Sequence, residues 1–261
     1  MTTAIIIPAR YGSTRLPGKP LMQIAGKSMI QRVVEIAHSV QGVDVVAVAT
    51  DDARIQAHVE SFGGTAVMTR EDAPNGTARV FEAAQKLAVR PDVVLNFQGD
   101  SPLTPPWIIA PVVAALQQNG VQVATPATRM TAESYAKLKA AKAGGEVGGT
   151  TVVCAENGDA LYFSKSLIPF VRKIDAASRF PVLRHVGLYG YTFKALENYF
   201  AWGECELENV EGLEQLRFLY HGVPIRVMEV DYKGRSHWGV DSAEDAKRVE
   251  EYIAREGELP L

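Results

Sequence analysis

The chain opens with the stretch Ile5-Ile-Ile-Pro-Ala-Arg-Tyr-Gly-Ser-Thr-Arg-Leu-Pro-Gly-Lys-Pro-Leu21. Residues 4–7 are apolar and mostly β-branched, which predicts a strand that is buried on both faces of a sheet. The loop that follows carries Arg10, Arg15 and Lys19, and no Asp or Glu occurs among the first 34 residues. Glycines let backbone N–H groups approach an anion, and cations neutralise it, so this Gly-containing loop predicts a phosphate site.

Composition narrows the class of protein. A chain of 261 residues with 47% hydrophobic residues is typical of a globular protein with a substantial core. The net charge of −3 argues against nucleic-acid binding. The two cysteines, Cys154 and Cys205, lack metal-ligand spacing, and their small number suits a reducing cytoplasm. No segment reaches about 18 apolar residues, so we expect neither a signal peptide nor a membrane span.

The first half alternates strand and helix patterns. Strand-like runs at 43–50, 65–68 and 92–97 are interleaved with helical patterns at 28–40, 53–62 and 77–88. This alternation predicts an α/β fold with a doubly wound, mostly parallel sheet, in which ligands bind beyond the carboxyl ends of the strands.

The second half predicts a mixed-sheet extension of the same domain. The expected elements are strands at 121–128, 150–155, 160–164, 185–193 and 224–230, and helices at 107–118, 131–142, 208–220 and 243–255. Asn157-Gly158 predicts a hairpin turn, and such a hairpin often supplies a dimer surface. We find no linker, so residues 1–261 are interpreted as one domain.

Two carboxylates stand where this fold would place ligands. Asp100 follows the strand at 92–97, and Asp241 lies at a strand-to-helix junction. Either could be an ordinary turn residue. Opposite a cationic phosphate loop, however, two carboxylates suit Mg²⁺, which takes hard oxygen ligands together with substrate phosphates.

Two of these motifs resemble the 3-deoxy-manno-octulosonate cytidylyltransferases (CMP-KDO synthetases), which couple CTP to an eight-carbon sugar acid. They are Pro8-Ala-Arg…Ser13-Thr-Arg-Leu-Pro-Gly-Lys-Pro-Leu21 and Asn96-Phe-Gln-Gly-Asp100, and the resemblance extends over about residues 4–253. It implies a nucleotide-binding half at about 1–119 and a sugar-binding half at about 120–261, which would also carry the dimer surface. It assigns catalytic roles to Arg10, Lys19, Asp100 and Asp241, nucleotide contacts to Arg10, Ser13, Arg15 and Lys19, and metal ligation to Asp100 and Asp241.

Further resemblances extend the nucleotide site and supply a sugar site. Asn75-Gly-Thr-Ala-Arg79 is similar to a nucleotide-binding loop of the family, although Ala78 replaces an acid. It implies that Asn75, Gly76, Thr77 and Arg79 reach the nucleotide, together with Gln98. The motifs His185-Val-Gly-Leu-Tyr-Gly-Tyr191 and Leu213-Glu-Gln-Leu216 imply a sugar site. Its residues would be Gln98, Lys165, His185, Tyr189, Glu214 and Gln215.

Departures from the family pattern collect in the sugar half. Lys165 stands where the family has an arginine, and Ser101 stands where Glu is common. Lys is a point charge, whereas Arg grips a carboxylate with two hydrogen bonds. We therefore hypothesise that the acceptor is a relative of KDO, another 3-deoxy-2-ulosonic acid.

The sequence thus predicts an Mg²⁺-dependent transfer of CMP from CTP to a 3-deoxy-2-ulosonic acid by a cytoplasmic homodimer. Two alternatives stay open. One is a different sugar nucleotidylyltransferase, acting on a neuraminate-like acid or a sugar 1-phosphate. The other is a nucleotide-binding regulator without turnover, which the changes at Ala78, Ser101 and Lys165 motivate.

Overall fold

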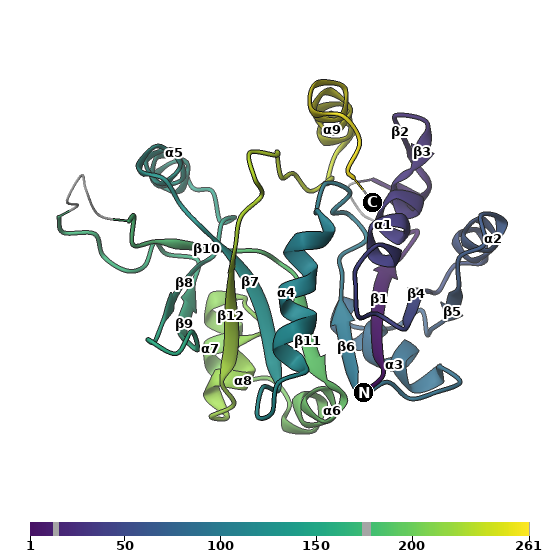
Figure 1. Cartoon of the computed structure of the whole chain (residues 1–261), viewed down its shortest axis with the longest axis horizontal. Helices are drawn as coiled ribbons and strands as arrows, with labels where there is room; N and C mark the ends of the chain where they lie inside the picture. The colour runs from purple at the N-terminus through teal and green to yellow at the C-terminus, as the bar shows by residue number, and fades with distance from the viewer. Residues whose placement is uncertain (13–15, 174–178, 261) are drawn as a thin grey trace.

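Strand β1 (Thr3–Ala9) lies inside a ten-stranded sheet in a computed structural model that describes residues 1–12, 16–173 and 179–260 (Figure 1). It pairs in parallel with β4 (Val45–Thr50) on one side and with β6 (Val93–Asn96) on the other. Strand β5 (Ala66–Met68) continues this parallel part beyond β4. The predicted doubly wound α/β fold with a mostly parallel sheet is confirmed.

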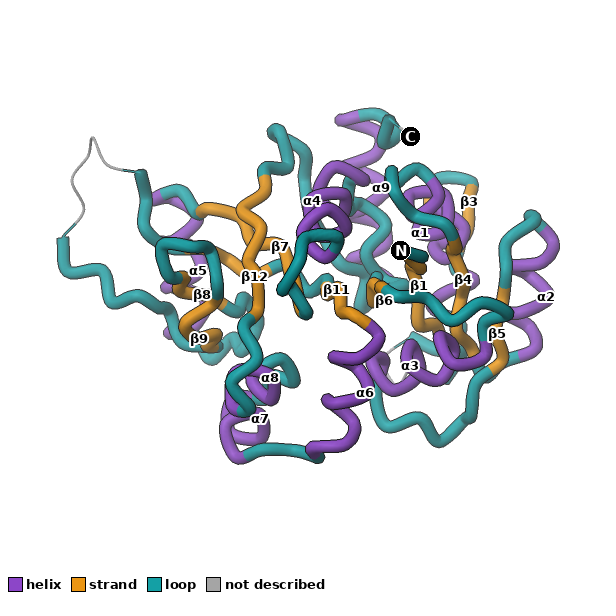
Figure 2. Tube along the Cα trace, turned by 60° about the horizontal axis from the view of Figure 1, so that its bottom comes forward, coloured by secondary structure: helices purple, strands orange, loops and turns teal. Residues whose placement is uncertain are grey.

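The sheet is covered on both faces, because successive side chains of a strand point to opposite sides. In β1, Ala4 and Ile6 pack into one core cluster, and Ile5 and Ile7 pack into the other. Figure 2 shows the two helical layers. The first core is completed by α3 (Gly76–Lys86), α6 (Phe193–Trp202) and α8 (Leu216–Tyr220), and the second by α1 (Met29–His38), α2 (Ala53–Ser61) and α4 (Pro106–Leu116).

Strand β7 (Val123–Arg129) is the centre of the predicted mixed-sheet extension. Strand β12 (Ile225–Val230) pairs with it in parallel, and the remaining strands pair antiparallel to their neighbours. These are β8 (Thr151–Cys154), β9 (Ala160–Ser164), β10 (Leu183–His185) and β11 (Tyr189–Thr192). Helix α5 (Ala132–Ala143) follows β7, and its Leu138 packs in a small separate cluster with Met130, Phe180 and Val182.

Two expectations about element boundaries were wrong. The strand expected at 185–193 is interrupted between β10 and β11, where the Val186 N–H bonds to the carbonyl of Pro126. Pro126 has no N–H with which to continue the ladder. The helix expected at 208–220 is divided into α7 (Glu206–Glu211) and α8, because Gly212 ends α7 in the left-handed conformation at φ 59°.

Helix α9 (Ala243–Glu256) packs over the small β2–β3 hairpin (Gln23–Ile24 and Lys27–Ser28), so the end of the chain returns to its beginning. Ser242 caps the N-terminus of α9, since its hydroxyl accepts the Asp245 N–H. Within the described ranges, no helix combines the length and the apolar character that crossing a membrane requires.

Candidate active site

A cleft of about 430 Å³ lies at the carboxyl ends of β1 and β6, where the fold predicts ligand binding. It is lined by parts of the chain that are far apart in sequence. The lining residues are Pro8, Ala9, Arg10, Lys19, Pro20, Met29, Ala73, Pro74, Asn75, Gly76, Arg79, Gln98, Gly99, Asp100 and Asp241.

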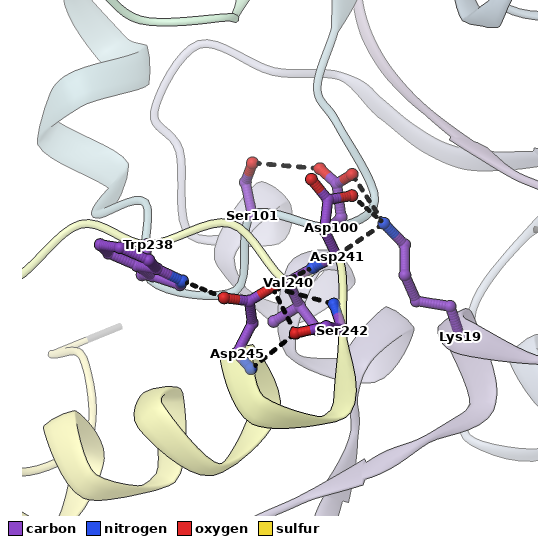
Figure 3. Close-up of polar contacts among 8 residues, drawn as sticks. All are labelled: Lys19, Asp100, Ser101, Trp238, Val240, Asp241, Ser242 and Asp245. Atoms are coloured by element: carbon purple, nitrogen blue, oxygen red, sulfur yellow. Dashed lines mark hydrogen bonds and ion pairs between the residues drawn. The ribbon is translucent and has the colours of Figure 1, made fainter. Parts of the chain in front are cut away.

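Lys19 joins the two predicted metal carboxylates (Figure 3). Its Nζ lies 2.9 Å from Asp100 Oδ2 and 3.3 Å from Asp241 Oδ1, and it donates to the Val240 carbonyl at 2.7 Å. The Lys19 side chain is 14% exposed, whereas those of Asp100 and Asp241 are 37% and 52% exposed. One cation therefore stands between two carboxylates that a ligand in the cleft can reach.

The position of Lys19 follows from a tight turn. Gly18 has φ 71°, which a residue with a side chain rarely adopts, and it begins the short 3-10 helix η1 (Lys19–Leu21). The Gly18 N–H bonds to the Tyr11 carbonyl at 2.9 Å, so the loop folds back on itself. The ring of Tyr11 is in turn covered by Arg54, whose guanidinium lies 3.3 Å from the ring centroid.

Asp241 is held by the N-terminus of α9. Asp245 accepts the backbone N–H groups of Asp241 and Ser242 at 3.0 and 2.9 Å, and it accepts the Trp238 indole N–H at 2.7 Å. The Val240 N–H bonds to the Asp100 carbonyl at 2.9 Å, which fixes the two aspartates side by side. This link between Asp245 and Trp238 was not predicted from the sequence.

The N-terminus of α3 faces the cleft with Asn75 and Gly76. Asn75 Oδ1 caps the helix by accepting the Ala78 N–H at 2.8 Å, so the helix begins correctly without the acid that Ala78 replaces. A helix N-terminus favours anions. Arg79 also lines the cleft, but its guanidinium is buried against Asp51 at 2.7 Å and is therefore already neutralised.

Arg10 is exposed in the cleft, and no carboxylate among the described residues forms an ion pair with it. The predicted Ser13 and Arg15 lie outside the described residues.

Among the six predicted sugar residues, Gln98 alone lines this cleft. Tyr189 and Gln215 are buried and Glu214 is half-buried, none of them lining the cleft, and burial raises the pKa of Tyr189 and of Glu214. Glu214 accepts the Thr77 hydroxyl at 2.8 Å, so Thr77 points into the protein and away from the cleft. Within the described part of the chain, the Gln215 Nε2 atom has no hydrogen-bond partner.

The remaining two predicted sugar residues lie further along the sheet. Lys165 lies against Gly212, where a Cβ would come within 2.8 Å of its Nζ. His185 bonds to the Thr125 hydroxyl at 2.9 Å, and burial lowers the pKa of His185 to about 3. It lines a larger cavity of about 1120 Å³ together with Arg184. The structure thus does not gather the predicted sugar residues around one cavity.

Within the described residues, no group of three or more His, Cys, Asp or Glu side chains could hold a metal ion. Asp100 and Asp241 offer two hard oxygen ligands in the cleft, a set that fits Mg²⁺ when phosphate oxygens supply others.

Comparison with known proteins agrees with this geometry. The family model described as cytidylyltransferase matches residues 4–228. A 3-deoxy-manno-octulosonate cytidylyltransferase of Maricaulis maris (strain MCS10) is 52% identical over 260 residues, with 99% of this chain and 100% of the relative covered. One from Anaeromyxobacter sp. (strain K) is 46% identical, with 96% and 97% covered. The solved structure of CMP:2-keto-3-deoxy-manno-octonic acid synthetase complexed with CTP has a TM-score of 0.86 at 39% identity, covering 98% of this chain and 100% of that chain.

Proposed function

Because the chain belongs to the family of 3-deoxy-manno-octulosonate cytidylyltransferases, we propose that it couples CTP to KDO and releases pyrophosphate. The observation that carries this proposal is the cleft in which Lys19 meets Asp100 and Asp241 at the carboxyl edge of the sheet. The similarity of the fold to a synthetase complexed with CTP supports the same nucleotide here.

The chemistry is a displacement at phosphorus. The anomeric hydroxyl oxygen of the sugar acid forms a bond to the α-phosphorus of CTP, the bond from that phosphorus to the bridging oxygen breaks, and the hydroxyl proton is released. Catalysis of this type rests on positioning and on neutralising charge. Arg10, Arg15 and Lys19 would neutralise the triphosphate and the leaving pyrophosphate, and Ser13 of the same loop would contact the nucleotide. The N-terminus of α3, with Asn75 and Gly76, would bind phosphate oxygens.

Asp100 and Asp241 would hold Mg²⁺. When bound, the ion supplies charge neutralisation at phosphate oxygens and lowers the pKa of an oxygen nucleophile. Arg79 would contribute by fixing α3, since Asp51 neutralises its charge. Gln98, Lys165, His185, Tyr189, Glu214 and Gln215 remain the proposed sugar-binding set, with closure of the chain around the substrates required to bring them together.

We further propose a single-domain, cytoplasmic homodimer. Both cysteines are free thiols, which suits a reducing compartment. Leu161 and Phe170, at the β8–β9 side of the sheet, are 63% and 89% exposed, and apolar side chains of this size suit a contact with a second copy. Light scattering after size exclusion would test the dimer, and a monomer at micromolar concentration would refute it.

The central experiment measures pyrophosphate release from CTP and Mg²⁺ with KDO, with related ulosonic acids and with a neuraminate-like acid. We expect release with KDO. Release with another acid alone would make Lys165 and Ser101 specificity determinants, and CTP binding without release would favour the regulator. Asp100→Asn should abolish pyrophosphate release. The control is Asp92→Asn, which should not abolish it, because the Asp92 carboxylate is exposed and bonds to the N-terminal segment, at the Thr2 N–H. A normal rate for Asp100→Asn would refute the metal assignment.

A further inference from the structure

We propose that Asn96 and Thr77 are positioning residues that orient the amide of Gln98, so that its carbonyl oxygen Oε1 accepts a hydrogen bond from the bound substrate. This inference rests on the proposed cytidylyl transfer and deepens it. The substrate group must be a hydrogen-bond donor. Two sources have this chemistry: the amino group of cytosine and a hydroxyl of the sugar acid.

A chain of three hydrogen bonds leads from the interior to the cleft. The Thr77 hydroxyl bonds to Glu214 Oε1 at 2.8 Å, Asn96 Nδ2 bonds to the Thr77 hydroxyl oxygen at 3.1 Å, and Gln98 Nε2 bonds to Asn96 Oδ1 at 3.0 Å. The residues come from α3, β6 and the loop before α8, so the chain of bonds connects both halves of the protein.

The direction of these bonds is set at the buried end. A carboxylate only accepts hydrogen bonds, so Thr77 gives its single hydroxyl proton to Glu214. The Thr77 oxygen can then only accept, and Asn96 must turn its NH₂ toward it. The Asn96 carbonyl oxygen then points toward Gln98. Because that oxygen only accepts, Gln98 must donate to it from its own NH₂ group. The free Oε1 atom of Gln98 consequently points the other way.

That free oxygen lies at the cleft. A Cβ atom added to Gly76, in the first turn of α3, would lie 4.0 Å from Gln98 Oε1, and both residues line the cleft. Asn96 is fully buried and Thr77 is 2% exposed, so water cannot replace a missing partner in the chain of bonds. Asn96 is the one polar residue of the apolar strand β6, and its role in this chain of bonds explains its presence there.

The test removes the Thr77 hydroxyl at constant shape. Thr77→Val should lower one of two measured quantities about three- to tenfold, as expected for one misdirected hydrogen bond. A lower ratio of kcat/KM for CTP over UTP would identify cytosine as the donor, and a lower kcat/KM for KDO at saturating CTP would identify the sugar hydroxyl. Thr77→Ser, which keeps the hydroxyl, should restore the value.

The decisive comparison is made in a Gln98→Ala background. If Thr77 acts through Gln98, Thr77→Val should have little further effect there on whichever of the two quantities it lowers in the wild-type background. Thr151→Val is the matched control. The buried Thr151 hydroxyl donates to the Ser166 carbonyl and accepts the Ile168 N–H, and neither bond belongs to the chain that ends at Gln98. The Thr151→Val protein should therefore lose stability without a change in selectivity.

An equal effect of Thr77→Val with and without Gln98 would overturn the inference, and so would an active Thr77→Val enzyme in which both measured quantities are unchanged. Failure of the proposed function is a separate result, since the wild type would then release no pyrophosphate. Calorimetric affinities for CTP and UTP across the same variants would still test the orientation of Gln98.

Discussion

Replacing Gly99 by Ala should lower kcat/KM for CTP about 10- to 100-fold in a protein that still folds. Gly99 stands between Gln98 and Asp100, and a Cβ atom there would lie 2.8 Å from the Pro8 carbonyl oxygen. Ordinary contact begins at 3.4 Å, so the two backbone segments must separate by about 0.6 Å. Both segments line the cleft, and a misplacement near 1 Å of groups that act on a substrate costs about 100-fold in rate.

Gly99→Ala should also lower the free energy of unfolding, but not enough to unfold the protein. Overpacking of this kind destabilises by about 1–3 kcal/mol, which corresponds to about 2–4 °C in Tm for each kcal/mol in a chain of this size. The measurements are pyrophosphate-release kinetics and thermal unfolding of the same preparations.

Gly64→Ala provides the matched control. A Cβ at Gly64 would meet Val59 Cγ1 at 2.8 Å and the Val59 carbonyl at 3.1 Å, in the turn between α2 and β5. We expect a comparable loss of Tm with unchanged kcat/KM. The reasoning would be refuted by a Gly99→Ala enzyme within twofold of the wild type, or by an equal loss of activity in Gly64→Ala.

Three further predictions concern charge. Lys19→Met should reduce kcat/KM at least 100-fold but shift Tm by only about 2 °C, because its ion pairs are partly solvated; near-normal turnover would contradict its role. Arg217→Met should destabilise by about 3–5 kcal/mol in urea unfolding, since it leaves Glu208 buried without its partner at 2.8 Å; replacing Glu208 by Leu as well should recover much of that loss. Because burial lowers the pKa of His185 to about 3, the unfolded chain binds an extra proton between that pH and about 6.5. Stability should therefore fall as the pH drops through this range, and His185→Asn should reduce that slope in urea unfolding measured from pH 7 to pH 4; an unchanged slope would count against it.

Periodicity predicted the sheet and most helices well because local burial dominates them. The run before Pro8 is apolar on both faces, and it became a strand that both core clusters bury. The two boundary errors arose where a tertiary contact intervenes. Gly212 breaks a helical pattern beside the Lys165 ammonium, and Pro126 interrupts a ladder on the neighbouring strand. Neither contact is visible in a local pattern.

In the candidate site, too, features set by local sequence were predicted and features set by tertiary contacts were not. The edge that holds Lys19, Asp100 and Asp241 followed from the strand ends. The directions of side chains did not. Arg79 was expected to meet the nucleotide, but Asp51 neutralises it, and Thr77 bonds to Glu214 inside the protein. Both partners come from distant segments, which spacing within a motif does not reveal.

The bond from Lys19 to the Val240 carbonyl spans 221 residues, and this has a consequence for the newly made chain. Domains generally begin to fold from the N-terminus during synthesis, so the cationic loop emerges from the ribosome long before the segment that carries Asp241. A nascent or prematurely terminated chain therefore contains the loop and Asp100 but lacks the remaining wall of the cleft. The cleft is therefore complete only after the segment that carries Val240 and Asp241 has been synthesised and has folded against Lys19.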